Sequence, residues 1–289
     1  MKIALTGGTG FIGSHFLRRV LCQDEHVVVA IRRSSDSKPR ILLDKHPIWL
    51  DRQLNDVTIE DLKGCDVFVH LATHSGNIPY DSLANCIYWN CTLIIDLFEK
   101  ARLAGIKSYI VAGSCFEYGR SGNYFPNIPT YASLEPTNSY AASKAIASVA
   151  LRQWAEEHGL AMEILRIFHV YGQGELESRF WPSLKRAAYS GYDFPMTKGE
   201  QLRDFQPVSI VARALLERAI NISQFRNYFQ IFNLSSGNPL SIRDFAQSQW
   251  NILGARGNLI VGALQYRDLE IMRFLPGPQS INLGDFIDE

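Results

Sequence analysis

The segment Thr6-Gly7-Gly8-Thr9-Gly10-Phe11-Ile12-Gly13 decides the expected fold, because of the residues that stand on either side of it. A short apolar run, Lys2–Thr6, precedes it, and Ser14–Cys22 comes next with apolar residues at helical spacing. The next apolar run, His26–Ile31, does not alternate with polar residues, which is typical of a parallel strand buried on both faces. The order strand, tight turn, helix, strand predicts a βαβ unit.

The glycines of this turn stand where a dinucleotide-binding turn needs them. Gly7 allows the tight turn, Gly10 lets a pyrophosphate approach the backbone, and Gly13 lets the helix pack closely on the strand. The free N–H groups and the dipole at the helix start favour a negative diphosphate. Glycine-rich turns also occur for backbone reasons alone, so a plain turn is the alternative. The cofactor residues predicted from this turn are Gly7, Thr9, Gly10, Phe11, Ile12 and Gly13.

Strand and helix patterns alternate along the chain to about residue 168. Further strands are expected at Ile48–Leu50, Asp66–Ala72, Ser108–Ala112 and Ala161–Phe168, and helices at Leu83–Ala104 and Tyr140–His158. This alternation predicts the α/β class, with a Rossmann-type doubly wound parallel sheet. From about Gly172 the pattern loosens, which indicates a smaller C-terminal substrate domain. We expect residues 1–172 and about 206–234 to bind the dinucleotide, and residues about 173–205 and 235–289 to bind the substrate.

Composition excludes several classes of protein. Among 289 residues, Lys+Arg and Asp+Glu both number 29, so the chain lacks the net charge of a general nucleic-acid or membrane-surface binder. The five cysteines form no CxxC pair and no His/Cys cluster has zinc spacing, so we expect no disulfide framework and no metal site. No signal-peptide pattern and no membrane-length apolar run stand in the sequence, and we expect a cytoplasmic protein.

The end of the second strand bears on the choice of cofactor. There a carboxylate would hold the ribose 2′-OH of NAD, and a basic residue would hold the 2′-phosphate of NADP. The sequence is Ile31-Arg32-Arg33-Ser34, with two guanidinium groups and no acid. A solvated arginine pair on a loop is the alternative. We therefore expect NADP (NADPH) to be preferred, with NAD possible, and Arg32, Arg33 and Ser34 to contact it.

Two further segments carry candidate catalytic groups. Tyr140-Ala-Ala-Ser-Lys144 puts a phenol and an ammonium group on one helix face, where the cation can stabilise the phenolate and make the phenol a usable proton donor. Ser114 lies at the C-terminal end of an expected strand, where open α/β sheets bind ligands. The Tyr-Lys spacing is common in helices, but its combination with Ser114 and the glycine turn is specific.

These motifs resemble those of the extended short-chain dehydrogenase/reductases, a group that includes nucleotide-sugar epimerases, dehydratases and ketoreductases. The resemblance covers most of the chain and rests on the glycine turn, Ser114, Tyr140 and Lys144, Asn90, Leu165-Arg166, Tyr171-Gly172 and Arg203-Asp204-Phe205. It implies that Tyr140 is the general acid, that Ser114 binds and polarises the carbonyl group, and that Lys144 holds the nicotinamide ribose and lowers the pKa of the tyrosine.

The same resemblance implies further cofactor contacts. Asp51 matches the family's adenine contact, and Leu71, Ala72 and Thr73 match the segment that lines the cofactor. For Asn90 two roles stay open: one in catalysis, and one in stabilising only a helix kink or a water molecule.

The C-terminal part is most similar to CDP-abequose and CDP-paratose synthase-type reductases, which reduce the 4-keto group of a nucleotide 4-keto-6-deoxyhexose. The similar segments are His169–Glu175, Gly199–Phe205 and Gly262–Met272. This resemblance implies that Arg203 holds the substrate diphosphate, although an Arg-Asp neighbour pair is also common as a surface or hinge ion pair. The implied substrate contacts are Ser114, Cys115, Phe116, His169, Arg203 and Arg267.

One departure from the family argues against dehydration. The 4,6-dehydratases carry an Asp-Glu pair directly after their Ser/Thr, but here Cys115 and Phe116 stand there and cannot exchange protons with a sugar. The expected function is therefore NADPH-dependent reduction of the 4-keto group of a CDP- or dTDP-4-keto-6-deoxyhexose. An NAD-dependent nucleotide-sugar epimerase is the alternative, and a protein that merely senses NADPH would be expected to lose one of Ser114, Tyr140 and Lys144.

The resemblance also implies a homodimer, formed by the helices Leu83–Ala104 and Tyr140–His158. Cys86, Trp89, Leu93 and Leu97 offer an apolar stripe for such an interface, but the stripe could equally face the protein's own sheet. Relatives commonly continue with another helix after the segment that matches Ile281-Asn282-Leu283, so truncation of this chain stays open.

Overall fold

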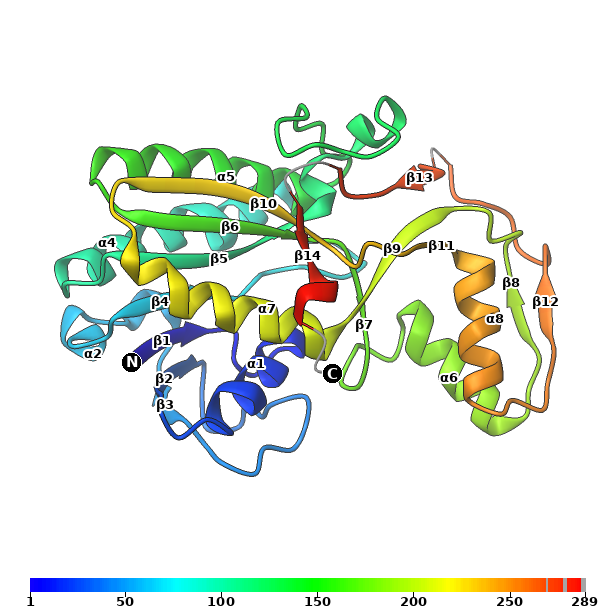
Figure 1. Ribbon diagram of the computed structural model, residues 1–289, viewed down its shortest axis with the longest axis horizontal. Helices are drawn as coiled ribbons and strands as arrows, with labels where there is room; N and C mark the ends of the chain where they lie inside the picture. The colour runs from blue at the N-terminus through cyan, green and yellow to red at the C-terminus, as the bar shows by residue number, and fades with distance from the viewer. Residues whose placement is uncertain (269, 278–279, 287–289) are drawn as a thin grey trace.

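The computed structural model describes residues 1–268, 270–277 and 280–286. Its first elements are strand β1 (Lys2–Thr6), helix α1 (Phe11–Leu21) and strand β2 (Val27–Arg32), and β1 pairs with β2 in parallel. The βαβ unit predicted from the glycine turn is therefore confirmed (Figure 1).

The large sheet has eight strands, and every pairing in it is parallel. In spatial order it consists of β14 (Ser280–Asn282), β10 (Tyr228–Ser235), β6 (Ala161–Ile167), β5 (Ser108–Ser114), β4 (Val67–His70), β1, β2 and β3 (Ile48–Asp51). The strand order reverses between β1 and β4, which is where doubly wound sheets bind their ligands. The predicted fold class is confirmed.

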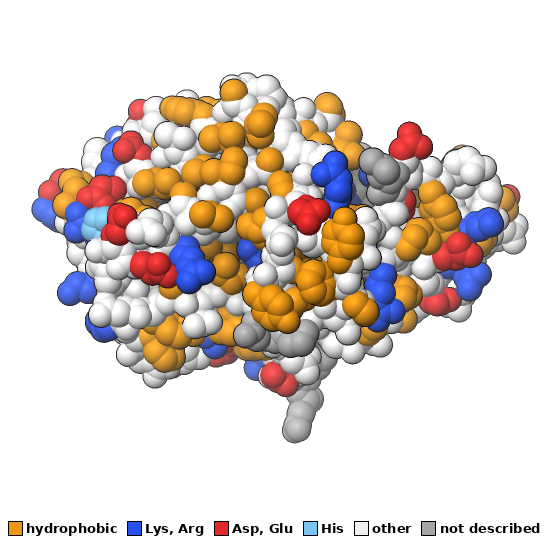
Figure 2. Space-filling view, turned by 90° about the horizontal axis from the view of Figure 1, so that it is seen from above, with side chains coloured by type: hydrophobic (Ala, Val, Ile, Leu, Met, Phe, Trp, Pro, Cys, Tyr) orange, Lys and Arg blue, Asp and Glu red, His pale blue; other side chains and the backbone are white. Residues whose placement is uncertain are grey.

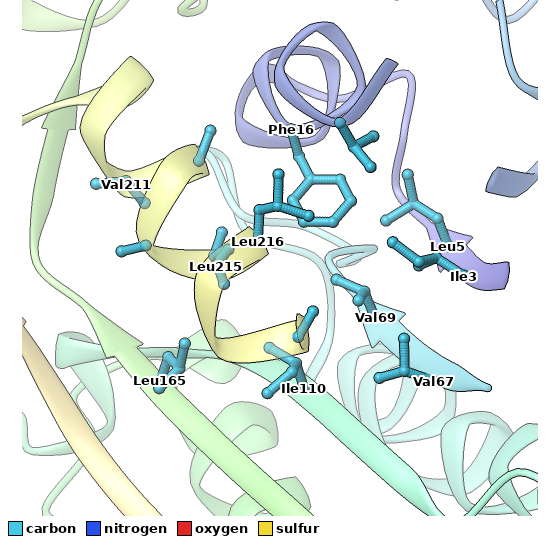
Figure 3. Close-up of a cluster of buried hydrophobic side chains, with 14 of the residues drawn as sticks. Ile3, Leu5, Phe16, Val67, Val69, Ile110, Leu165, Val211, Leu215 and Leu216 are labelled. Carbon is cyan, nitrogen blue, oxygen red and sulfur yellow. The ribbon is translucent and has the colours of Figure 1, made fainter. Parts of the chain in front are cut away.

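Helices cover both faces of this sheet. On one face, α1 and α7 (Val208–Asn221) close a core that includes Leu5, Phe16 and Leu215 (Figure 3). On the other face, α4 (Leu93–Leu103) and α5 (Ser139–Glu157) close a second core. The short helices are α2 (Ile59–Leu62), α3 (Leu83–Ile87), the π-helical turn η2 (Tyr88–Thr92), and the 3₁₀ helices η1 (Leu54–Asp56), η3 (Cys115–Glu117), η4 (Arg120–Asn123), η5 (Ile222–Gln224) and η6 (Leu283–Phe286).

The helix predicted over Leu83–Ala104 is confirmed over Leu83–Leu103, with the π-helical turn η2 between α3 and α4. Of the apolar stripe on it, Cys86, Leu93 and Leu97 are buried, and Trp89 is partly exposed. Leu97 belongs to the core that α4 and α5 close on the sheet, so part of the stripe packs against the protein itself.

The smaller part of the molecule lies beside the carboxyl ends of the large sheet, to the right in Figure 1. It contains β7 (His169–Tyr171), α6 (Phe180–Ser190), β8 (Phe194–Met196), β9 (Leu202–Pro207), β11 (Pro239–Ser241), α8 (Ile242–Ile252), β12 (Leu259–Val261) and β13 (Arg273–Phe274). Strands β7, β11 and β13 pair with β9, and β12 pairs with β8.

Two details differ from the sequence expectation. Regular helices occupy the stretch after Gly172 whose pattern looked loose, namely α6, α7 and α8. In addition, Ser280–Asn282 was expected in the substrate domain, but this strand hydrogen-bonds to β10 in the large sheet. Among the described residues, no helix is both long enough and apolar enough to span a membrane, and no group of three or more His, Cys, Asp or Glu residues has metal-binding geometry.

Candidate active site

The glycine turn lies at the point where the strand order reverses. Gly7 has a φ of +77°, and a Cβ atom there would lie 2.4 Å from the backbone nitrogen of Ala72, which follows β4. A Cβ atom on Gly13 would lie 2.0 Å from the carbonyl oxygen of Gly7, so only glycine lets α1 pack this closely on the turn. Thr9, Phe11 and Ile12 stay partly exposed beside it. The start of α1 therefore faces the carboxyl ends of β1 and β4, which suits a diphosphate.

At the end of β2 the two arginines differ in their surroundings. Arg32 lies opposite Asp51 in the β2–β3 register, donates from Nε to Asp51 Oδ1 at 2.5 Å, and stacks 4.5 Å from the centre of the Trp49 ring. Arg33 and Ser34 are exposed. Strand pairing thus places a carboxylate beside Arg32, and the contact of Arg32 with the cofactor stays a prediction. Arg33 is the arginine without such a partner in the described structure.

Ser114, Tyr140 and Lys144 come together at the carboxyl edge of the sheet. Ser114 ends β5, and the other two lie in the first turns of α5, whose N-cap Asn138 accepts a hydrogen bond from the backbone of Ala141 at 2.9 Å. The Tyr140 phenol lies beside the side chains of Ser114 and Thr73, and both act to lower its pKa. These contacts join the end of β5, the loop after β4 and the start of α5 around one hydroxyl group.

The protonation of Tyr140 and Lys144 differs from the expectation. Burial raises the pKa of Tyr140 to about 12, although hydrogen bonding to Ser114 works against this. Lys144 Nζ donates to the carbonyl oxygen of Ala112 at 2.8 Å, and burial lowers the pKa of its ammonium group. Loss of solvent is the largest influence on the phenol here, and the lowering of the tyrosine pKa by Lys144 stays a prediction. A protonated phenol is the form that a proton donor requires.

Asn90 lies in η2 and bridges three segments. Its Nδ2 donates to the carbonyl oxygen of His74 at 3.0 Å and to Ser143 Oγ at 2.9 Å, and its Oδ1 accepts from the backbone nitrogen of His74 at 2.7 Å. These contacts favour the alternative in which Asn90 stabilises a local distortion of the helix, the π-helical turn η2, because they tie η2 to α5 and to the loop after β4.

That loop also brings a residue that the sequence did not single out. The Tyr80 ring stacks on the Tyr140 ring, with centroids 6.1 Å apart and planes 9° apart. The ion pair between His74 Nε2 and Asp81 Oδ2 (2.8 Å) closes the loop on itself. This stacking could not be predicted from the sequence, because the sequence does not show where the loop that carries Tyr80 runs.

Some of the expected substrate contacts form one aromatic and basic side of the site. This side, called the wall below, consists of Phe116, His169, Phe205, Phe274, Arg179 and Arg203. The Phe116 ring lies 6.1 Å from that of His169, which in turn lies 6.3 Å from those of Phe205 and Phe274. Burial holds the pKa of His169 well below its usual value, with Arg203 and Arg179 adding to the effect, and its Nδ1 has no hydrogen-bond partner within the described structure. A neutral imidazole therefore faces the basic groups.

The three remaining predicted substrate contacts, Cys115, Arg203 and Arg267, differ in their surroundings. Cys115 is buried, and burial raises the pKa of its thiol, so it packs as an apolar residue rather than as a nucleophile. Arg203 is buried and pairs with Glu270 Oε1 at 2.6 Å, so the ion pair observed is not the expected surface pair of neighbouring Arg and Asp residues. Its charge also acts on His169 and Cys115. Arg267 is exposed after β12, and the described structure gives its side chain no hydrogen bond or ion pair with the other candidates.

Two charged residues near this wall escaped the sequence analysis. Arg179, the N-cap of α6, acts on both His169 and Cys115, and its Nε lies 3.6 Å from Glu175 Oε1. Burial raises the pKa of Glu175 to about 7. Both come after the Tyr171-Gly172 motif, but only the turn back into α6 brings them to the site. A groove of about 360 Å³ opens beside Glu175, between this turn and α6.

Glu117 is a further residue that the sequence analysis passed over. It is fully buried, and it accepts hydrogen bonds from the Ser114 backbone, from Ser148 and from Arg166. The sequence showed its position three residues after Ser114, but its partner Arg166 stands on another strand. A strand pairing that places Gly113 opposite Arg166 brings them together.

A parallel sheet with a glycine turn at its reversal point and a Ser-Tyr-Lys set at its carboxyl edge defines the extended short-chain dehydrogenase/reductases. Within this class, the sequence model of the NAD-dependent epimerase/dehydratase family matches residues 3–231, so the chain belongs to that family.

Several known proteins are similar to the chain over most of their length. CDP-abequose synthase of Salmonella typhimurium is 25% identical over 276 residues, which cover 93% of this chain and 87% of the relative. The dTDP-4-dehydro-6-deoxy-D-allose reductase of a Streptomyces species is 26% identical, covering 87% and 81%. The UDP-N-acetylglucosamine 4-epimerase of Methanobrevibacter ruminantium, solved with UDP-N-acetylmuramic acid, superposes with a TM-score of 0.81 at 25% identity, covering 96% and 89%.

Proposed function

We propose that the protein reduces the 4-keto group of a nucleotide-activated 4-keto-6-deoxyhexose, a CDP- or dTDP-sugar, with NADPH. The observation that carries this proposal is a protonated Tyr140 beside Ser114, next to positions 115 and 116, which carry Cys and Phe rather than the Asp-Glu pair of the dehydratases. Such a site can give a proton to a carbonyl oxygen but cannot remove water from a sugar. The product would enter deoxysugar or polysaccharide biosynthesis.

The glycine turn fits a dinucleotide. Gly7 and Gly13 leave space that a Cβ atom would fill, so backbone N–H groups at the start of α1 can approach a pyrophosphate. In our proposal Gly10, Leu71, Ala72 and Thr73 line the cofactor, and Asp51 lies near the adenine. NADPH, when bound, supplies the hydride.

The residues of the chain then divide the remaining work. The Ser114 hydroxyl donates a hydrogen bond to the substrate carbonyl oxygen and polarises it. Tyr140 gives its phenolic proton to that oxygen as negative charge develops there. Lys144 binds the nicotinamide ribose and, once turned from the Ala112 carbonyl toward the phenol, stabilises the phenolate that is left.

The carboxylate of Glu117, whose charge acts on Tyr140, is not available as a base for dehydration. Glu117 is fully buried and already accepts three hydrogen bonds, one of them from the guanidinium of Arg166. Cys115 and Phe116 pack in an apolar cluster with Phe168 and Phe274. These surroundings support reduction over removal of water.

The preference for NADPH rests on Arg33. Its guanidinium is exposed at the end of β2 and suits the 2′-phosphate as a multi-donor cation. Arg32 would support it from its place over Trp49, where its charge is shared with Asp51.

The substrate assignment rests on the basic wall and on the relatives. Arg203 and Arg179 supply positive charge beside His169, which suits a diphosphate. The reductase relative acts, by its name, on a dTDP-4-dehydro-6-deoxy sugar, and the other relative is a CDP-abequose synthase. We therefore place the sugar nucleotide between Ser114 and this wall, with the substrate domain comprising residues about 173–205 and 235–277.

We also propose that the protein is a cytoplasmic homodimer. Cys86, Leu93 and Leu97 are buried, so the interface would use other apolar side chains of the same helices. Ile146 and Val149 on α5 are 41% and 62% exposed, and apolar side chains spread over the face on the α5 side in Figure 2. Helices of two subunits would pack there with C₂ symmetry.

An epimerase is the second candidate, favoured by the structural likeness to a UDP-N-acetylglucosamine 4-epimerase. An epimerase returns the hydride to its substrate and keeps NAD bound, whereas a reductase consumes NADPH.

The test is an assay of NADPH oxidation against CDP-, dTDP-, GDP- and UDP-4-keto-6-deoxyhexoses, with the bound nucleotide of the purified protein measured in parallel. We expect one NADPH consumed per alcohol formed and little bound NAD. Stoichiometric bound NAD together with interconversion of two sugar nucleotides, without net oxidation, would replace the reductase with the epimerase.

A further inference from the structure

Glu117 links the three elements that carry or flank the candidate active site. Its Oε1 accepts a hydrogen bond from the Ser114 backbone at 2.7 Å. Its Oε2 accepts from Ser148 Oγ at 2.7 Å and from Arg166 Nε at 2.9 Å. Because these donors belong to β5, α5 and β6, one carboxylate fixes the spacing between Ser114 and the helix that carries Tyr140.

The ion pair between Glu117 and Arg166 is fully buried, and stability alone does not explain it. Arg166 is 2% exposed, donates from Nη1 to the carbonyl oxygen of Thr130 at 3.0 Å, and lies 4.5 Å from the centre of the Tyr118 ring. Removing two charges from water costs much of what their attraction returns, so an apolar pair of the same volume would often be as stable. A buried pair at this place therefore indicates a requirement for position or charge.

The neighbouring glycine makes room for the pair. A Cβ atom on Gly113 would lie 3.0 Å from Glu117 Oε1 and 3.1 Å from Arg166 Cγ. The residue before Ser114 thus leaves the space in which the carboxylate reaches back to the strand end.

Ser148 transmits this anchoring to the reacting groups. It stands four residues after Lys144 and eight after Tyr140 on α5, so the three side chains lie on one helix face. A hydrogen bond at Ser148 therefore sets the rotation and axial position of the helix. Displacing a reacting group by about 1 Å can cost about 10²-fold in rate.

The charge of Glu117 acts on both reacting groups. Burial is the largest influence on each, raising the pKa of Tyr140 and lowering that of Lys144, and Glu117 raises both. Other titratable groups also face them: Cys115 faces Tyr140, while Cys91 and His70 face Lys144. The carboxylate thus favours a protonated phenol and a charged ammonium group together.

We propose that Glu117 is a positioning residue for the reaction at Tyr140: it holds Ser114 through the backbone and α5 through Ser148, while Arg166 holds the carboxylate. The inference rests on the proposed function in one respect, since it takes Tyr140 as the proton donor.

The test is Glu117→Gln, assayed with NADPH and the panel sugar that the wild type reduces fastest. We expect kcat to fall by about 10- to 100-fold with little change in KM, because the reacting groups are misplaced while the binding wall is intact. The loss of activity at high pH should also move to lower pH by roughly one unit, because removing the anion stabilises the phenolate. An unmoved pH profile would overturn the inference.

The matched control is Glu163→Gln. Glu163 is also fully buried on β6, and it accepts from Arg218 Nε at 2.7 Å, but at the other end of the strand. We expect this variant to lose stability without moving the pH profile. Equal losses of kcat and unmoved profiles in both variants would leave Glu117 with a structural role only.

A second variant covers the case in which Glu117→Gln does not fold, as judged by circular dichroism. Ser148→Ala keeps the ion pair and removes only the link to α5, so kcat should fall with KM unchanged, and a normal kcat would overturn the inference. Tyr140→Phe separates this inference from the proposed function. If Tyr140→Phe is inactive and Glu117→Gln behaves as wild type, only the inference fails, whereas an active Tyr140→Phe removes the proton donor assumed for both.

Discussion

At position 140, one hydroxyl group distinguishes tyrosine from phenylalanine, and the proposed chemistry depends on it. The Tyr140 side chain is half-buried, its phenol is protonated because its pKa is raised to about 12, and it lies beside Ser114. Tyr140→Phe keeps the ring and its stacking on Tyr80, so turnover should fall by about 10²- to 10⁴-fold with folding unchanged. Steady-state NADPH oxidation measures this. Tyr192→Phe, at an exposed position, is the control, and near-normal turnover of Tyr140→Phe would remove it from the mechanism.

Arg33 offers a second test at the residue scale. Arg33→Ala should weaken NADPH by about 1.5–3 kcal/mol for each lost charge-assisted hydrogen bond and should affect NADH much less. Dissociation constants from nucleotide fluorescence give both values. Arg226→Ala removes an equally exposed arginine from the loop before β10 and should change neither. Equal weakening of the two cofactors by Arg33→Ala would show that Arg33 is not the phosphate contact.

Residue identity alone did not reveal how these groups are engaged. The sequence shows Arg32 and Asp51 but not that the β2–β3 register sets them side by side. In the same way, Glu117 and Arg166 are 49 positions apart in sequence and become one ion pair only when β5 and β6 align. The sequence motifs therefore predicted which charged side chains are present. The strand register determines which of them form ion pairs with one another.

At the scale of elements, the glycine turn predicted the fold because its local geometry requires a strand before it and a closely packed helix after it. Helix α6 was not predicted because Pro182 and Gly191 make the sequence pattern there look irregular. Pro182 occupies the first turn of α6, where its missing N–H group has no helical partner to lose. Gly191 is the left-handed C-cap that ends the same helix.

The packing of α1 on β1 can be tested directly. In Gly13→Ala the new methyl group would meet the Gly7 carbonyl oxygen at 2.0 Å, so α1 must move. We expect a loss of about 1–3 kcal/mol in the free energy of unfolding and strongly weakened NADPH binding. Urea unfolding and fluorescence titration measure the two effects.

Gly191→Ala is the control for that experiment. Its φ of +70° makes alanine unfavourable, but nothing lies within 4 Å of the new Cβ atom. Stability should fall while NADPH binding stays normal. Wild-type NADPH affinity in Gly13→Ala would contradict the role given to the turn.

At the scale of the whole molecule, the proposed dimer predicts a solution mass near twice 32.6 kDa by light scattering. Val149→Glu places a charge on the exposed apolar face of α5 and should yield monomers, because burying an unpaired charge at an interface is costly. Leu42→Glu, at a residue 90% exposed in a loop, should remain dimeric. A wild-type mass near that of one chain at micromolar concentration would defeat the proposal.

Strand β14 is the outermost strand at one edge of the large sheet. Its three residues pair with Asn233–Ser235 of β10, whose backbone groups would otherwise stand unpaired along the flank of the molecule. Unpaired strand edges recruit other strands and lead to aggregation, and a very short outermost strand is one way in which proteins prevent this. The opposite margin, β3, is also short and carries the charges of Asp51 and Arg52 near its end. Both flanks of the sheet are thereby poor templates for sheet-to-sheet growth, which leaves helical surfaces as the places where copies of this chain can meet.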